Sequence, residues 1–326
     1  MFCQFVSKRG VRCHDKVLSG SSWCHRKRHY PDNRTYRGVV ESLKAQWKKT
    51  TFSTALFDMY LVPEDGWCFF YSFGYSLLRM MKRMLSKYPL EERARRWRES
   101  TDPILVFFRR DRFRQFFEGK MEEVMFRKEM ARALQTLGSE WILRNLNTKH
   151  EQTGELVQDL LLSSHELDSV DEYKEEIKNL PSIDDKNVLS QSNWGSVCEQ
   201  YALAKHFKVN VMILSPVTFS LQGKVFRSRI AKVVRRNVTR LSPMSHCIPD
   251  GHTSELGNFL QMAEDSDDSM AVSLFWETLP DSLKAKTQNE LMRTAYLVWF
   301  SDIDEDGDDV SHYNYLVLNP ELLPKK

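Results

Sequence analysis

The chain has 326 residues, of which 41% are hydrophobic and 28% are charged. This balance is typical of a globular protein with one large domain and an appendage, and it excludes a wholly disordered chain. The sequence contains no apolar run of about 18 residues, and Met1–Gly10 mixes Cys, Gln, Lys and Arg where a signal peptide needs an apolar stretch. We therefore expect a soluble, cytoplasmic protein that does not enter a membrane.

Charge is unevenly distributed along the chain. The formal net charge is only +3. Residues 1–50 hold six Lys and six Arg against Asp15, Asp32 and Glu41, a local excess of nine positive charges, so the remainder is net acidic. This asymmetry predicts a basic N-terminal appendage with a partner of its own, either nucleic acid or an acidic surface.

Three of the six cysteines gather near the N-terminus, in a segment of residues 1–32 that ends at a turn-forming Pro-Asp-Asn. In a reducing compartment, Cys and His residues grouped in this way indicate a structural zinc module rather than a disulfide framework. Unligated thiols in a basic tail are the alternative. The expected ligands are Cys3, Cys13, Cys24 and His29, with His14 and His25 as alternatives for the fourth place.

Residues 33–326 are expected to form the second and larger domain. Its first two-thirds is mainly helical in pattern: Phe69, Phe73, Leu77 and Met81, for example, recur every fourth residue, as in an amphipathic helix. The predicted helices are Val39–Lys49, Phe69–Met84, Ile104–Leu146 with a break near Gly138, Glu155–Leu162, Val170–Leu180 and Glu199–His206.

The pattern changes after Trp194-Gly195. Apolar residues alternate over Val209–Leu214, which predicts a strand. Near the C-terminus, Tyr296–Phe300 and His312–Leu318 are strand-like runs joined by an acidic turn that contains Asp-Gly, a pattern typical of a β-hairpin. Between these strands, residues 216–294 are first basic and then acidic, and they have no period of their own.

Cys68 is the candidate nucleophile. It ends the run Asp65-Gly66-Trp67-Cys68 and is expected at a helix N-terminus, where free amide groups and the helix dipole favour thiolate over thiol. Gly66 permits a tight turn before the helix. This turn would aim the backbone N–H of Cys68 and one from a neighbouring loop at a substrate carbonyl oxygen, which is the geometry of an oxyanion hole.

His312 is the candidate general base. In a strand, residues two apart point to the same face, so Asn314 lies beside His312. An amide oxygen that accepts the imidazole N–H holds the ring in the tautomer and orientation that a thiol nucleophile needs.

Three motifs in order resemble the ovarian-tumour (OTU) family of cysteine proteases. They are Asp65-Gly66-Trp67-Cys68-Phe69-Phe70, then Trp194-Gly195-Ser196-Val197-Cys198-Glu199 followed by the strand Val209–Leu214, and finally His312-Tyr313-Asn314-Tyr315. The resemblance covers residues from about 55 to 318. It implies an α/β (α+β) fold, with a small central β-sheet flanked by helices.

The resemblance also implies a deubiquitinase, a thiol-dependent ubiquitinyl hydrolase that cleaves ubiquitin or a ubiquitin-like protein from lysine side chains without a catalytic metal. By the family pattern Cys68 is the nucleophile, His312 the base and Asn314 the residue that orients it, and the loop from Asp65 to Cys68 supplies the oxyanion donors. Two features depart from the pattern. Trp67 stands where the family commonly has Asn, which would alter the packing of the loop or cover the site. Residues 216–294 form an insertion, a candidate lid or substrate-selecting segment.

A catalytically idle OTU-like protein that binds nucleic acid or a protein partner is the alternative function. The N-terminal Cys/His cluster also resembles short modules in proteins of large eukaryotic DNA viruses, which points to a viral protein in the host cytoplasm or the virion. The sequence does not indicate an oligomeric state.

Several other patterns have ordinary structural interpretations. Cys198 and Cys247 lack a neighbouring base and are expected to be structural. His206 is expected at a helix end, and the remaining histidines are expected at the surface. The turn after Asp302 begins like a calcium loop but has Tyr313 where a Glu ligand is required, so we expect a solvated turn, or one that attracts the arginines of a ubiquitin-like tail. The basic stretch Lys224–Arg240 is read as a solvated face, with nucleic-acid binding as the alternative.

Overall fold

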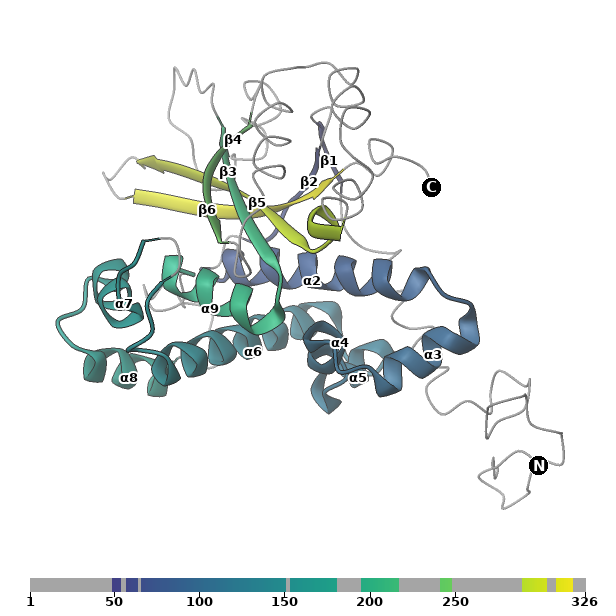
Figure 1. The fold of residues 1–326 in the computed structure, drawn as a ribbon. Helices are drawn as coiled ribbons and strands as arrows, with labels where there is room; N and C mark the ends of the chain where they lie inside the picture. Colours follow the sequence, from purple (N-terminus) through teal and green to yellow (C-terminus); the bar gives the residue numbers. More distant parts are fainter. Residues whose placement is uncertain are drawn as a thin grey trace, which may run out of the picture. The chain divides into compact units, whose positions relative to one another are not determined.

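The structure is a computed structural model and describes residues 49–53, 57–63, 66–150, 153–180, 195–216, 241–247, 289–303 and 309–318. Within these ranges the chain is a mixture of helices and one small mixed sheet, so its class is α+β (Figure 1). The described helices are α2 (Cys68–Ser86), α3 (Leu90–Glu99), α4 (Pro103–Phe108), α5 (Asp111–Phe117), α6 (Glu123–Arg144), α7 (Val157–His165), α8 (Val170–Lys178) and α9 (Val197–Phe207). The described strands are β1 (Lys49–Ser53), β2 (Phe57–Tyr60), β3 (Asn210–Pro216), β4 (Leu241–Cys247), β5 (Thr294–Ile303) and β6 (Asp309–Leu318).

The sheet has the strand order β1-β2-β6-β5-β3-β4. Strands β3 and β5 are parallel, and the other neighbours are antiparallel. The β5–β6 pair is the hairpin that the sequence predicts, with Phe300 opposite His312. Strand β6 is therefore an inner strand, held by β2 on one side and β5 on the other.

The chain divides into two compact units, of which the described parts are residues 81–126 and the remaining residues. The smaller unit is built around buried aromatic rings. Phe113, for example, lies 5.7 Å from Phe126 and 4.8 Å from Phe107 between ring centroids. Edge-to-face and tilted contacts of this kind add to the free energy gained from burying the rings.

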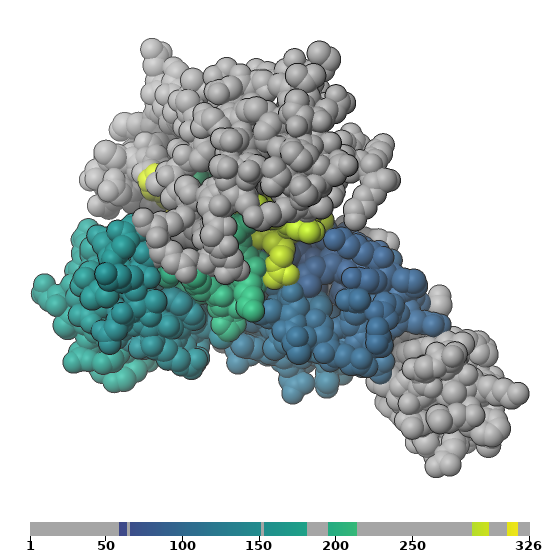
Figure 2. Space-filling view, viewed as in Figure 1, coloured from purple at the N-terminus to yellow at the C-terminus, as the bar shows by residue number. Residues whose placement is uncertain are grey.

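In the larger unit, the first part of α2 lies between the sheet and α6 (Figure 1). Its sheet side contacts Tyr313 of β6, and on the other side Gly74 approaches Met130 of α6 so closely that an added Cβ would lie 2.6 Å from the Met130 methyl group. Helix α7 packs against both α8 and α9, and Figure 2 shows the surface of α7 and α8 next to that of α9. None of the described helices is both long and apolar enough to cross a membrane.

Several predicted elements are confirmed, with small shifts at their ends: they correspond to α2, α7, α8, α9, β3, β5 and β6. The predicted break near Gly138 is wrong, because Gly138 lies inside α6. The long predicted helix Ile104–Leu146 is interrupted earlier, where α4 ends at Phe108 and where Gly119 adopts a left-handed conformation (φ +72°) after α5.

The sequence patterns missed other elements. Of the predicted helix Val39–Lys49 only Lys49 is described, and it begins strand β1. Helix α3 was not predicted because it buries only Ala94 and Trp97 and is otherwise charged apart from the exposed Leu90, which leaves little apolar periodicity. Strand β4 lies inside the predicted insertion of residues 216–294 and pairs with β3. The predicted domain boundary at residue 32 lies outside the described residues.

Candidate active site

Cys68 is the first residue of helix α2. The carbonyl of Trp67 accepts the backbone N–H of Tyr71 at 2.9 Å, which makes Trp67 the N-cap, and Gly66 before it has φ +83°. Only glycine adopts this conformation without strain, so Gly66 provides the tight turn that the sequence predicts. The first N–H groups of a helix have no acceptor within the helix, so Cys68 occupies a position suited to stabilising negative charge.

The Cys68 thiol lies against strand β6. The backbone N–H of Tyr313 donates a hydrogen bond to Cys68 Sγ at 3.4 Å. One turn along α2, the Ser72 hydroxyl donates to the carbonyl oxygen of Tyr313 at 3.3 Å. Tyr313 is the residue between His312 and Asn314, so these two hydrogen bonds bring the candidate nucleophile on α2 to the segment that carries the candidate base.

Asn314 is fully buried and fixes the tautomer of His312. Its Oδ1 atom accepts the backbone N–H of Val62 at 3.0 Å and lies 3.2 Å from His312 Nε2. Because a backbone N–H can only donate, the amide atom at this position must be the oxygen. His312 Nε2 must then carry the proton and donate it to Asn314. The lone pair that can accept a proton is therefore on Nδ1.

His312 is held in its neutral form. Burial lowers the pKa of His312 to about 4, and the hydrogen bond that His312 donates to Asn314 opposes this effect only in part. At pH 7 the imidazole is therefore unprotonated and can act as a base. It is 3% exposed, so its ring is largely shielded from bulk water.

Trp67, the departure from the family pattern, is itself buried. Its indole lies edge-on to the ring of Phe70 at 6.4 Å, and the guanidinium carbon of Arg132 lies 5.0 Å from the ring centroid. Phe70 is on α2 and Arg132 is on α6. The tryptophan therefore joins the loop before Cys68 to both helices.

The central motif, Gly195 to Glu199, supports the site from the side of α9. Gly195 touches the ring of Phe69 so closely that an added Cβ would lie 1.8 Å from a ring carbon. A larger residue at position 195 would displace Phe69, the neighbour of Cys68. Trp194, the first residue of the motif, lies outside the described residues.

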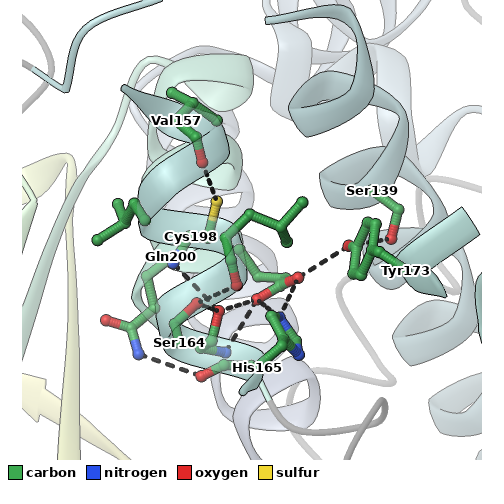
Figure 3. Close-up of polar contacts among 12 residues, drawn as sticks. Ser139, Val157, Ser164, His165, Tyr173, Cys198 and Gln200 are labelled. Atoms are coloured by element: carbon green, nitrogen blue, oxygen red, sulfur yellow. Dashed lines mark hydrogen bonds and ion pairs between the residues drawn. The ribbon is translucent and has the colours of Figure 1, made fainter. Parts of the chain in front are cut away.

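Glu199 is buried at the start of α9, where it closes a capping box. The backbone N–H of Ser196 donates to Glu199 Oε2 at 3.0 Å, and the Ser196 hydroxyl accepts the backbone N–H of Cys198 at 3.2 Å. The same carboxylate lies 3.0 Å from His165 Nε2 and accepts the Tyr173 hydroxyl at 2.9 Å. Figure 3 shows His165 and Tyr173 pointing toward the start of α9, and the Tyr173 hydroxyl also reaches Ser139.

The Glu199–His165 contact is an ion pair. Burial favours the uncharged form of each residue, but the opposite charge and hydrogen bonding outweigh burial, so the pKa of Glu199 is lowered and that of His165 is raised. The expectation that the remaining histidines lie at the surface is therefore wrong for His165, and also for His150, which is 2% exposed. His165 is the last residue of α7, and His150 lies in the connection between α6 and α7, so neither belongs to an apolar pattern that would reveal its burial.

The other predicted site residues divide into two groups. Cys198 is buried and its Sγ lies 3.8 Å from the carbonyl oxygen of Val157, as expected for a structural thiol, while Cys247 lies on β4. Asp65, the ligand candidates Cys3, Cys13, Cys24 and His29 with their alternatives His14 and His25, the stretch Lys224–Arg240 and the turn 304–308 lie outside the described residues. Among the residues that the structure does describe, no three His, Cys, Asp or Glu side chains are grouped so that they would hold a metal ion.

Sequence reasoning missed three contributors to the site. Ser72 is one helical turn after Cys68, and this spacing was a usable signal. Val62 and Gln200 gave no such signal, since Val62 acts through its backbone N–H on a residue 252 positions away and Gln200 acts on Tyr313 from 113 positions away.

Comparison with known proteins adds no relative: no family model, no curated protein and no solved structure matches this chain.

Proposed function

We propose that the chain is a cysteine isopeptidase of the OTU deubiquitinase class. It hydrolyses the bond between the C-terminal carboxyl group of ubiquitin, or of a ubiquitin-like protein, and a lysine side chain. One observation carries the chemical part of the proposal: Asn314 holds His312 with Nδ1 free, on the strand whose next residue, Tyr313, donates to the Cys68 thiol. The choice of ubiquitin rests on the three sequence motifs.

In this mechanism His312 Nδ1 takes the proton of Cys68, and the sulfur attacks the carbonyl carbon of the isopeptide bond. The carbonyl electrons move to the oxygen, where the N–H groups at the start of α2 and in the loop before it stabilise the oxyanion. When the oxyanion collapses, the carbon–nitrogen bond breaks, and His312 returns its proton to the lysine amine. A thioester to Cys68 remains.

Water then hydrolyses the thioester. His312 removes a proton from the water molecule as its oxygen attacks the thioester carbonyl, and the carbon–sulfur bond breaks to release the free carboxylate and regenerate the thiol. Asn314 serves in both the formation and the hydrolysis of the thioester. It accepts the hydrogen bond from His312 Nε2–H and so stabilises the imidazolium that forms in each stage. No electron transfer and no metal ion take part in these steps.

The direct test is cleavage of a panel of diubiquitins of different linkages by the full chain. We expect cleavage of at least one linkage, and a loss of about a thousandfold or more in rate for Cys68→Ala and for His312→Ala. Cys198→Ala is the matched control, since it removes a buried thiol on α9 and should keep the activity. No cleavage of any linkage by the wild-type chain, or equal cleavage by Cys68→Ala, would contradict the proposal.

A further inference from the structure

Tyr313 connects three elements of the site. Its backbone N–H donates to Cys68 Sγ at 3.4 Å, and its carbonyl oxygen accepts the Ser72 hydroxyl, so its main chain is tied to α2 on both sides. Its ring meets the ring of Phe69 edge-on, with 5.5 Å between the centroids. Its hydroxyl reaches away from α2 to Gln200 of α9.

Gln200 is 3% exposed and has two partners for its amide group. Its Nε2 donates to the Tyr313 hydroxyl at 3.3 Å and to the carbonyl oxygen of Gly195 at 3.2 Å (Figure 3 shows Gln200 reaching toward the start of α9). Both N–H bonds of the amide are thus used. An apolar residue of similar shape at position 200 would lose both hydrogen bonds, and the carbonyl oxygen of Gly195 would lose this donor.

These contacts form a closed ring around the start of α2. Gln200 binds Tyr313, Tyr313 contacts Phe69, Phe69 touches Gly195, and the carbonyl of Gly195 returns to Gln200. The nucleophile is on α2 and the candidate base is on β6, so their alignment depends on how firmly these two elements are joined. Misplacement of reacting groups by a fraction of an ångström is enough to slow a reaction.

We propose that Gln200 is a positioning residue, which acts through Tyr313 to set the alignment of Cys68 with His312. Gln200 does not touch the reacting atoms. It holds the Tyr313 side chain, and thereby the backbone N–H that supports the Cys68 sulfur and the neighbouring His312. The role in catalysis rests on the proposed function, but the effect on the thiol does not.

The test measures the rate at which iodoacetamide alkylates Cys68 in the full chain, followed on the Cys68 peptide as a function of pH. We compare the wild type with Gln200→Met, Tyr313→Phe and the double variant. Each single variant should lower the rate near neutral pH by about tenfold and change the shape of the pH profile. The double variant should be no slower than the slower single variant, because both substitutions break the same link.

Tyr296→Phe is the matched control. It removes a buried tyrosine hydroxyl of the same sheet, which donates to the carbonyl oxygen of Leu291 at 3.4 Å, and Tyr296 lies opposite Leu316 rather than beside Cys68. Cys68 in this variant should be alkylated at a rate within twofold of the wild-type rate. The free energy of unfolding is measured for both tyrosine variants. If Tyr296→Phe is destabilised as much as Tyr313→Phe but its Cys68 still reacts at the wild-type rate, lowered stability alone does not slow alkylation.

The proposal is overturned if Cys68 in both single variants is alkylated at a rate within twofold of the wild type at every pH. It is overturned as well if the decreases in rate of the two single variants multiply in the double variant. It is also overturned if wild-type Cys68 reacts no faster than the buried Cys198. Because alkylation needs no ubiquitin, a chain that cleaves no diubiquitin but shows the expected alkylation pattern would refute the proposed function and leave the positioning role intact. Where diubiquitin is cleaved, Gln200→Met should lower kcat with little change in KM.

Discussion

Asn314 decides which nitrogen of His312 can act as a base. The side chain is fully buried, and its oxygen is shared between Val62 N–H and His312 Nε2. The identity of this residue could be predicted from the sequence, because two residues separated by one position share a face of a strand. The partner that fixes the direction of its amide group could not, since Val62 contributes only a backbone N–H.

Asn314→Asp and Asn314→Ala should differ in their effects. An aspartate oxygen accepts the same two N–H groups and adds a negative charge, so the pKa of His312 rises and the acid limb of kcat/KM moves to higher pH while activity is retained. Alanine removes the acceptor and frees the other tautomer, so kcat falls by about a hundredfold. Steady-state kinetics between pH 4 and 9 on the full chain separates the two. Equal losses in both variants would mean that the residue only fills space.

The lowered pKa of His312 also predicts how stability depends on pH. Its folded value of about 4 lies below the ordinary value of 6.5, so between these two pH values the unfolded chain binds a proton that the folded chain does not. The contribution of neutral His312 to the free energy of unfolding is therefore present above pH 6.5 and is lost as pH falls toward 4. The loss amounts to about 3 kcal/mol between these two pH values.

Urea denaturation of the wild type and of His312→Gln at pH 7 and pH 4.5 measures this contribution. The variant should lose less stability between the two pH values than the wild type does. A pH dependence unchanged by the substitution would show that His312 titrates normally in the folded protein.

At the scale of secondary structure, the start of α9 is the element that supports the site. Gly195 touches Phe69, Glu199 closes the cap, and Gln200 binds Tyr313. The motif that contains these residues was recognised in the sequence, but its function there was not apparent. The glycine and the glutamate of the motif serve packing and capping rather than chemistry.

Gly195→Ala tests the packing of the start of α9 against α2. The added Cβ would lie 1.8 Å from a ring carbon of Phe69, so the ring must move, which should cost about 1–3 kcal/mol of stability and slow the reaction of Cys68 with a ubiquitin electrophile. Gly138→Ala on α6 is the matched control. Its Cβ would meet Leu203 at 3.7 Å, an ordinary contact, and alanine favours a helix, so stability should stay the same or rise by about 1 kcal/mol.

Thermal denaturation and probe labelling measure both variants. If Gly195→Ala were as stable and as reactive as Gly138→Ala, the close contact with Phe69 would not matter to the site.

The ion pair of His165 and Glu199 ties α7 to the start of α9. Replacing His165 with Leu leaves a buried carboxylate without its counter-charge, which should cost about 3–5 kcal/mol and raise the pKa of Glu199. Adding Glu199→Gln removes the buried charge and keeps an oxygen for the Ser196 N–H, so it should recover part of the loss. Urea denaturation at pH 7 compares the three proteins, and a double variant less stable than His165→Leu would contradict this account.

The pH dependence of this pair has the opposite sign to that of His312. The raised pKa of His165 means that its contribution is fully present below pH 6.5 and is lost as pH rises through the folded value. The wild type should therefore lose stability toward alkaline pH in a way that His165→Leu does not. Urea denaturation at pH 7 and pH 9 checks the sign.

At the scale of the whole molecule, patterns of local sequence were more informative than contacts between distant residues. The four-residue recurrence of Phe69 to Met81 predicts α2, and the two strand-like runs joined by an acidic turn with Asp-Gly predict the β5–β6 hairpin, because both patterns depend on neighbours in the chain. The pairing of β4 with β3 was not predicted, since Leu241–Cys247 contains Pro243 and lacks strict alternation. The division into two units also escaped prediction, because residues 81–126 interrupt the larger unit in sequence.

The candidate nucleophile and base show the same contrast between local pattern and distant contact. The sequence selects Cys68 and His312 by their neighbours, but Tyr313, which contacts the Cys68 thiol, lies 245 positions further along the chain. Only the folded arrangement shows that the thiol lies against the strand that carries His312 and Asn314. The function that we propose depends on this arrangement.

The most direct measurement is labelling of the full chain with ubiquitin that carries a C-terminal electrophile, followed by mapping of the adduct. We predict one adduct per chain, located at Cys68, absent in Cys68→Ala, and formed about a hundredfold more slowly in His312→Ala. An adduct at another cysteine, or no adduct with a chain whose Cys68 reacts with iodoacetamide, would contradict the central claim.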